Sequence, residues 1–327
     1  MHLRRNLIRK AVVVALVTVS LALLATTLLV GPSGAAQRKY TIAFLADPAM
    51  TKGTRAAAKT LGVRVLFPKC CAGGPDGAVK LIESLIASHV DAIVVEGYDP
   101  TAEPIFAKVR KAGILLISAG DDIAGKRDLW VSHSDNVAYG QALGDALASQ
   151  MGRQGEYAIL DEQGEYPIAR TWKKIVAAYI PKAYPKMKLD AMLTETGAGD
   201  QNEVDSVKGF MAVHPNLKGL IGIAPTEAYM AAEAITQAGR IGQVFSAGNG
   251  DDNIPPDFQL RGYVQSGAAQ LVYASNPIQQ AYVTVWAAHY LLTGHHFRSG
   301  AYQVGGPIGQ VWYYPKHQEL RVGPPTW

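Results

Sequence analysis

The stretch from Val79 to Asp122, VKLIESLIASHVDAIVVEGYDPTAEPIFAKVRKAGILLISAGDD, decides the fold. Apolar residues recur at helical spacing between Val79 and Ile86. Asp91–Glu96 follows at once and is a short apolar run, of the kind that lies buried on both faces of a parallel sheet. A second helix ends at Gly113, and Ile114–Ser118 forms the next strand. Because two strands joined by a helix form a right-handed βαβ unit, the stretch predicts an α/β fold with a parallel sheet.

The same alternation of strand and helix covers most of the chain. Strands are expected at 40–45, 63–67 and 129–132 around the first stretch, and a second set is expected at 156–160, 188–193, 220–223 and 244–247. The tail after Gly294 is rich in glycine, proline and aromatic residues and contains one expected strand, at 311–314. This loose duplication predicts two doubly wound sheets of about five strands each.

The first thirty-six residues differ from the rest. Four basic residues precede a run from Ala11 to Val30 that has no charge, and small residues follow from Gly31 to Ala36. This pattern predicts a secretory signal peptide, residues 1–36, cleaved after Ala36. The alternative is an uncleaved membrane anchor, because about twenty apolar residues are long enough to span a bilayer. Either reading places the chain in the periplasm or another extracytoplasmic space.

The charge balance excludes one class of partner. Of 31 basic residues, four lie in the leader, so the remaining 27 equal the 27 acidic residues and the mature chain is near neutral. The net charge of +4 therefore reflects export, and no nucleic-acid partner is expected.

The chain has two cysteines, the adjacent pair Cys70 and Cys71. Neighbouring cysteines rarely bridge each other, because the small ring strains the peptide bond between them. A metal site or an intermolecular bridge stays open as an alternative to an ordinary loop pair. No histidine or acidic residue stands at ligand spacing beside them, so no metal or cofactor is expected.

Several blocks in this order resemble the sugar-binding proteins of the type I periplasmic binding family: LIASHVDAIVV at 85–95, DP at 99–100, KAGI at 111–114, SDN at 134–136, GNG at 248–250 and NP at 276–277. The resemblance covers about residues 39 to 314. The run IAP at 223–225 is most similar to the branch that holds rhamnose-binding and autoinducer-2-binding receptors.

The resemblance implies two Rossmann-like lobes with parallel sheets, joined by three hinge crossings. By this resemblance the N-terminal lobe takes residues 38–134 with 276–304, and the C-terminal lobe takes 135–275 with 305–327. The crossings then fall near 134/135, 275/276 and 304/305. Ligands of such open sheets bind at the carboxyl ends of the strands, beside helix N-termini.

The residues that follow each expected strand are therefore the candidate ligand contacts. The resemblance and this placement together give eight of them: Asp47, Asp121, Arg170, Pro225, Glu227, Asn249, Ser275 and Asn276. A carboxylate such as Asp121 can accept from two neighbouring sugar hydroxyls, and the fork of Arg170 suits a diol. Two positions depart from the family: Ala119-Gly120 replaces the acid that usually ends this strand, and Asn249 replaces an aspartate.

Aromatic residues that stack on a pyranose in the family are missing from the connection Pro48–Gly53. Trp172 stands two residues after Arg170, about 200° around the helix, so we expect it to pack inside the lobe. Four tyrosines could compensate, although each also suits a partly buried core position: Tyr98, Tyr166, Tyr229 and Tyr273. The ligand is therefore expected to be smaller or more polar than a hexopyranose.

These observations predict a monomeric, exported solute-binding receptor of an ABC importer, which binds a small sugar or polyhydroxy ligand and delivers it to the permease. A binding protein that serves a sensor or chemoreceptor is the alternative. An enzyme is not expected, because the chain has no Gly-x-Ser-x-Gly, His-Glu-x-x-His or phosphate-binding glycine motif. A sugar-responsive repressor would need a helix-turn-helix where the leader stands.

Overall fold

A computed structural model describes residues 39–45, 50–68, 74–96, 103–162, 167–250, 260–273, 276–305 and 308–323. Residues 40–327 form one compact unit of their own. The predicted leader, Asp47, the two cysteines and Ser275 lie outside the described residues. Within those ranges, no helix is long and apolar enough to cross a membrane.

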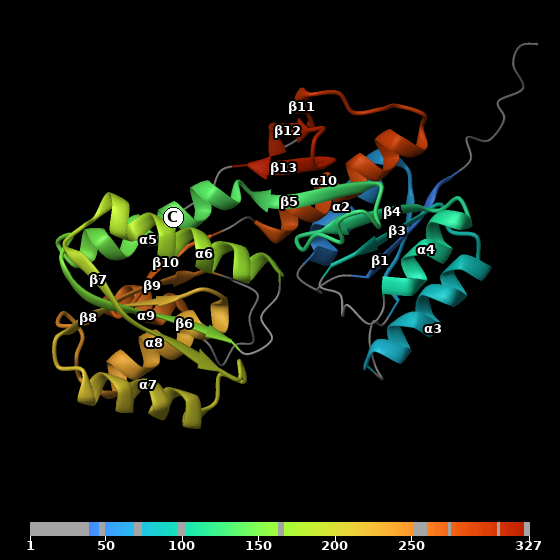
Figure 1. Ribbon diagram of the computed structural model, residues 1–327. Helices are drawn as coiled ribbons and strands as arrows, with labels where there is room; N and C mark the ends of the chain where they lie inside the picture. Colours follow the sequence, from blue (N-terminus) through green and yellow to red (C-terminus); the bar gives the residue numbers. More distant parts are fainter. Residues whose placement is uncertain are drawn as a thin grey trace, which may run out of the picture. The chain divides into compact units, whose positions relative to one another are not determined.

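The first sheet runs in the order β2-β1-β3-β4-β5-β13-β12-β11 (Figure 1). Strands β1 to β5 pair in parallel, and each lies close to its expected range: Thr41–Leu45, Arg64–Leu66, Ala92–Val95, Leu115–Ala119 and Leu129–Ser134. All four residues of β3 are buried, which confirms the expectation for the apolar run at 91–96.

The second sheet has the order β7-β6-β8-β9-β10 and is parallel throughout. Its strands are Gly155–Glu162 (β6), Met187–Glu195 (β7), Leu217–Gly222 (β8), Phe245–Asn249 (β9) and Gln270–Val272 (β10). This order matches β2-β1-β3-β4-β5 of the first sheet, strand for strand, so the duplication expected from the sequence is present. Two mainly parallel sheets with covering helices confirm the predicted fold class, although the first sheet has eight strands where about five were expected.

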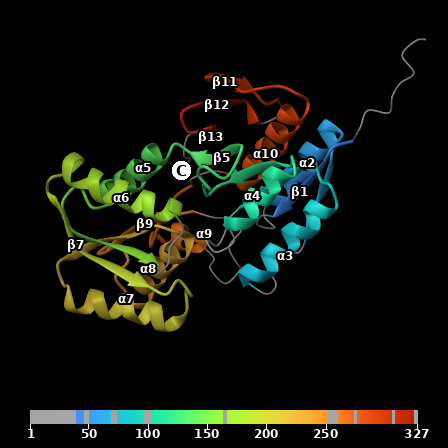
Figure 2. The same ribbon diagram turned by 45° about the vertical axis from the view of Figure 1, so that its right-hand side comes forward.

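Helices cover both sheets. Helices α3 (Gly74–Ala87) and α4 (Glu103–Lys111) pack on one face of the first sheet, and α2 (Thr51–Leu61) and α10 (Pro277–Leu292) on the other (Figure 2). In the second sheet, α5 (Asn136–Gln150) and α6 (Pro167–Ala183) share a core with β6 and β8, while α7 (Gln201–Val213) and α8 (Pro225–Gln237) share the opposite one. The short helix α9 (Leu260–Ser266) packs beside α8.

Polar side chains cap three of the described helices at their starts. Asp135 caps α5 by accepting from the backbone N–H of Ala138 over 2.9 Å. Asp200 caps α7 in the same way, and Asn276 caps α10. Each cap satisfies an N–H group that has no partner inside its helix.

The end of the chain departs from the expected lobes. Residues 305–327 were assigned to the C-terminal lobe, whereas β12 (Gln310–Tyr314) and β13 (Glu319–Gly323) extend the first sheet together with β11 (Gly300–Gln303). Strand β13 runs parallel to β5, with Leu320 opposite Val131. Val311, Leu320 and Val322 are buried in the first sheet's core, so this segment gains its apolar burial there. The expected strand at 311–314 is confirmed, but its assignment to the other lobe is corrected.

Candidate functional site

The site begins at the carboxyl end of β4. Asp121 lies two residues beyond this strand and is only 9% exposed. Its Oδ1 accepts a hydrogen bond of 3.2 Å from the backbone N–H of Ile168, in the first turn of α6. Burial raises the pKa of Asp121, while the Ile168 hydrogen bond and the positive charge of Arg170 oppose that rise. The carboxylate therefore accepts from the Ile168 N–H and is acted on by the charge of Arg170, and both of these residues belong to α6.

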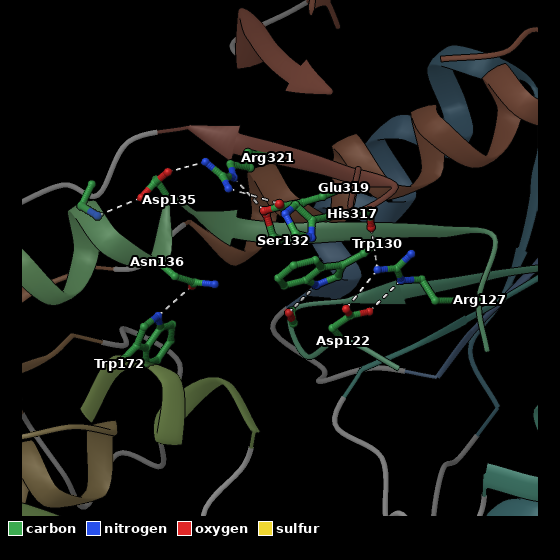
Figure 3. Close-up of polar contacts among 12 residues, drawn as sticks. Asp122, Arg127, Trp130, Ser132, Asp135, Asn136, Trp172, His317, Glu319 and Arg321 are labelled. Carbon is green, nitrogen blue, oxygen red and sulfur yellow. Dashed lines mark hydrogen bonds and ion pairs between the residues drawn. The ribbon is translucent and has the colours of Figure 1, made fainter. Parts of the chain in front are cut away.

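Arg170 and Trp172 occupy the first turns of α6 with different exposure. Arg170 is exposed and acts electrostatically on Asp121, so the structure brings these two predicted residues together. Trp172 is 4% exposed, its ring lies 4.4 Å from that of Tyr139, and its indole N–H donates to Asn136 Oδ1 over 2.8 Å (Figure 3). The expectation that Trp172 packs inside the lobe is confirmed.

Pro225 and Glu227 stand in the first turn of α8, directly after β8. Pro225 is the first helical residue, where a missing N–H costs nothing. Glu227 is fully buried, and its Oε2 accepts from the backbone N–H of Ala224 over 3.0 Å. Its Oε1 is buried with no hydrogen-bond partner among the described residues. Burial raises the pKa of Glu227 to about 7, and the nearby charge of Glu162 adds to the rise.

This arrangement assigns Glu227 a capping role that the sequence analysis did not consider. Ala224 has no side-chain acceptor, so only the glutamate half of a capping box is present. The sequence held the signal, because a glutamate three residues after a helix start is the usual partner in this motif. Glu227 remains a candidate ligand contact through its second oxygen.

Asp161 is a buried acid at the same edge of the second sheet that sequence reasoning missed. It lies near the end of β6, is 4% exposed, and forms an ion pair with Lys173 of α6. Thr194 Oγ1 of β7 donates to Asp161 Oδ1 over 2.8 Å. The acid directly follows the apolar run 158–160, the same signal that selected Asp121, and could have been found in that way.

Asn249 lies at the end of strand β9, and Asn276 lies at the start of helix α10. Asn249 is the last residue of β9 and is 8% exposed. The next residue, Gly250, leaves room for Tyr273, because a Cβ there would lie 2.7 Å from the tyrosine ring. Asn276 is exposed and uses its side-chain oxygen to cap α10, accepting from Ile278 N over 2.9 Å.

The remaining candidates divide by where they fall. Asp47, Ser275, Tyr98 and Tyr166 lie outside the described residues. Tyr229 is partly buried, 6.0 Å from the ring of Tyr263. Among the described histidine, aspartate and glutamate side chains, no group of three or more is arranged to hold a metal ion. The described contacts thus centre the site on Asp121, the α6 N-terminus and Arg170.

Two mainly parallel sheets with polar side chains at the carboxyl ends of their strands define a two-sheet α/β protein, and open sheets of this kind bind ligands at those strand ends. The chain belongs to the periplasmic binding protein domain family, whose model matches residues 39–296. This membership confirms the resemblance drawn from the sequence.

Individual relatives agree with that membership. The D-allose-binding periplasmic protein of Escherichia coli (strain K12) is 26% identical over 241 residues, which cover 70% of this chain and 74% of that protein. The crystal structure of a sugar ABC transporter from Actinomyces odontolyticus gives a TM-score of 0.72 at 22% identity, covering 88% of this chain and 94% of that one.

LsrB from Clostridium saccharobutylicum, in complex with AI-2, gives a TM-score of 0.71 at 15% identity, covering 88% and 96% of the two chains. At these identities the two structures establish the fold. The relatives are solute-binding proteins and not enzymes, in agreement with the sequence analysis.

Proposed function

We propose that this chain is the exported receptor of an ABC importer and binds a small sugar or other polyhydroxy compound, which it delivers to the permease. The observation that carries the proposal is the buried Asp121 carboxylate, held beside the α6 N-terminus and Arg170. A sugar hydroxyl both donates and accepts, so an acceptor beside a guanidinium donor suits two neighbouring hydroxyls.

Electrostatics favour an uncharged polyhydroxy solute over an anion. Asp161 and Glu162 contribute negative charge near the start of α8, since both raise the pKa of Glu227. Lys173 is already paired with Asp161. An anionic ligand would meet these carboxylates, whereas hydroxyl groups could donate to them.

The ligand class is supported by the allose-binding relative, and the transport role by the ABC context of the related structures. Export is supported by the leader pattern in residues 1–36. The proposed receptor works as a monomer. The structural likeness to the AI-2 complex favours one alternative, in which the bound solute is a signal that is passed to a sensor.

A thermal-shift screen tests this function directly. The chain without residues 1–36 is suitable, because residues 40–327 form a compact unit of their own. A ligand at a hundred times its Kd stabilises the folded state by about 2.7 kcal/mol, which raises Tm by roughly 5 °C or more. We expect D-allose, another monosaccharide, a polyol or AI-2 to produce such a shift. If the whole panel leaves Tm unchanged while a set of amino acids raises it, the sugar-receptor function is wrong.

A further inference from the structure

Asp121 lies in a loop whose two neighbouring residues are both fixed. On one side, Gly120 donates its backbone N–H to Val131 O over 3.0 Å and accepts from the Trp130 indole N–H over 2.8 Å. Gly120 has φ +74°, a conformation that favours glycine at this turn. The backbone before Asp121 is therefore tied to β5 at two points.

On the other side, Asp122 is held by Arg127 across the loop (Figure 3). The guanidinium donates Nε–H to Oδ1 over 2.6 Å and a terminal N–H to Oδ2 over 3.0 Å. Arg127 is 5% exposed and the Asp122 side chain is 25% exposed, so the two-point contact is partly buried. Such a paired geometry fixes direction as well as distance.

The remaining donors of Arg127 reach the turn between β12 and β13, almost two hundred residues later in the chain. One terminal N–H donates to the backbone carbonyl of His317 over 2.8 Å, and the other nitrogen donates to Gln318 Oε1 over 3.3 Å. The guanidinium carbon also lies 6.0 Å from the centre of the Trp130 ring. The C-terminal hairpin thus supports the loop that carries Asp121.

We propose that Arg127 is a positioning residue for the ligand site: it holds Asp122 against the C-terminal turn, so that Asp121 is aimed at the first turn of α6. The described contacts of Arg127 all lie on the first sheet and its loops, whereas Asp121 reaches a helix of the second sheet. Where the inference concerns ligand affinity it rests on the proposed function, but the aiming of Asp121 does not.

A double-mutant cycle read at the Ile168 amide proton tests the aiming without any ligand. In the chain lacking residues 1–36, Asp121→Asn should change the ¹H shift of Ile168, because its acceptor loses its charge. In an Arg127→Gln background, the difference in Ile168 ¹H shift that Asp121→Asn causes should fall to less than half of its size in the parent. In an Arg127→Lys background the difference should be intermediate. A residue with only a structural role would lower Tm without altering this coupling.

Arg110→Gln is the matched control, since Arg110 pairs with Asp128 at the other end of the same loop and is largely exposed. It should leave the Asp121 effect at Ile168 at full size. If Arg127→Gln does not fold, Arg127→Lys and Gln318→Ala replace it in the test. Gln318 is exposed, and its substitution removes only one acceptor of Arg127. An Asp121 effect of equal size in every folded background overturns the proposal.

Titration with D-allose adds the functional arm. Arg127→Gln should weaken D-allose binding about tenfold, and it should have almost no further effect once Asp121 is already Asn. Fully additive losses would show that Arg127 does not act through Asp121. If D-allose and the other sugars fail to bind the parent chain, the proposed function fails, while the Ile168 cycle still decides the role of Arg127.

Discussion

Asp121 Oδ1 accepts a hydrogen bond from the backbone N–H of Ile168, 47 residues later in the chain. The first residue follows a strand of the first sheet, and the second opens a helix that follows a strand of the second sheet. A helix N-terminus presents unpaired N–H groups and partial positive charge. The contact therefore joins an acceptor from one sheet to donors from the other, which is the chemistry that a hydroxylated ligand requires.

Arg170→Ala should weaken sugar binding without unfolding the protein. Arg170 lies two residues after Ile168 and acts on the Asp121 carboxyl. Hydrogen bonds from a charged donor contribute about 1.5–3 kcal/mol, so affinity should fall about ten- to a hundredfold. Calorimetric titration with the sugar that gives the largest thermal shift measures the effect.

Lys174→Ala is the control for this measurement, because Lys174 is an exposed cation on the same helix. Its loss should change affinity less than twofold. Equal affinities for the parent and for Arg170→Ala would remove Arg170 from the site.

Glu227→Gln should stabilise the protein above neutral pH and have little effect in acid. Burial raises the pKa of Glu227 from its ordinary 4.5 to about 7. The folded state thus favours the protonated form, and this contribution to stability is complete below pH 4.5 and is lost as pH rises through 7. Glutamine keeps an oxygen for the Ala224 N–H and carries no charge, so it avoids that loss.

The gain should approach about 3 kcal/mol at pH 8 as an upper value. Urea unfolding at pH 4.5 and pH 8 measures it, with Glu83→Gln as the exposed counterpart on α3. A stability difference between Glu227→Gln and the parent that does not grow with pH would contradict the account.

Gly222→Ala should destabilise the second sheet by about 2 kcal/mol or more, since a buried overlap forces the backbone to move. A Cβ at Gly222 would lie 2.3 Å from the backbone nitrogen of Ala228, in the first turns of α8. Gly209→Ala is the opposite case, because a Cβ there meets no atom within 4 Å on an exposed face of α7. It should stabilise by about 0.5–1 kcal/mol. Chemical unfolding in which both variants move in the same direction would refute this prediction.

Leu320→Ala should cost about 2–5 kcal/mol, because Leu320 of β13 is fully buried in the first sheet's core. Trp312→Ala on the neighbouring strand β12 should cost less than about 1 kcal/mol, since Trp312 is 50% exposed. Thermal unfolding compares the two. Similar small losses would mean that β13 contributes little to the core, and would argue against its place beside β5.

The sequence predicted the parallel strands well, because their signal is local. An uninterrupted apolar run such as Ala92–Val95 is typical of a strand that is buried on both faces of a sheet. The cap of α5 is a local signal of the same kind, because Asp135 directly precedes the helix and its residue type favours that position. The tail was harder: the strand at 311–314 was visible, but the choice of sheet depends on how Leu320 pairs with Val131, almost two hundred residues away.

The site could be predicted only in part for the same reason. The rule of strand ends pointed to Asp121, which the structure shows to be buried and bonded to Ile168 of α6, and the family resemblance pointed to Arg170. The contacts that aim Asp121 involve Arg127, His317 and Gln318, which no local pattern connects. Glu227 was chosen by position, whereas its burial and its hydrogen bond to Ala224 depend on how β8 meets α8.

Calorimetric titration of D-allose into the parent chain and into Asp121→Asn tests the central claim most directly. Asparagine keeps the shape of the side chain and an oxygen for Ile168, but it removes the charged acceptor. We expect saturable binding at one site in the parent, and an affinity at least about tenfold lower in Asp121→Asn, because a charge-assisted hydrogen bond is lost. Equal affinities in the two proteins would contradict the assignment of Asp121 to the ligand site.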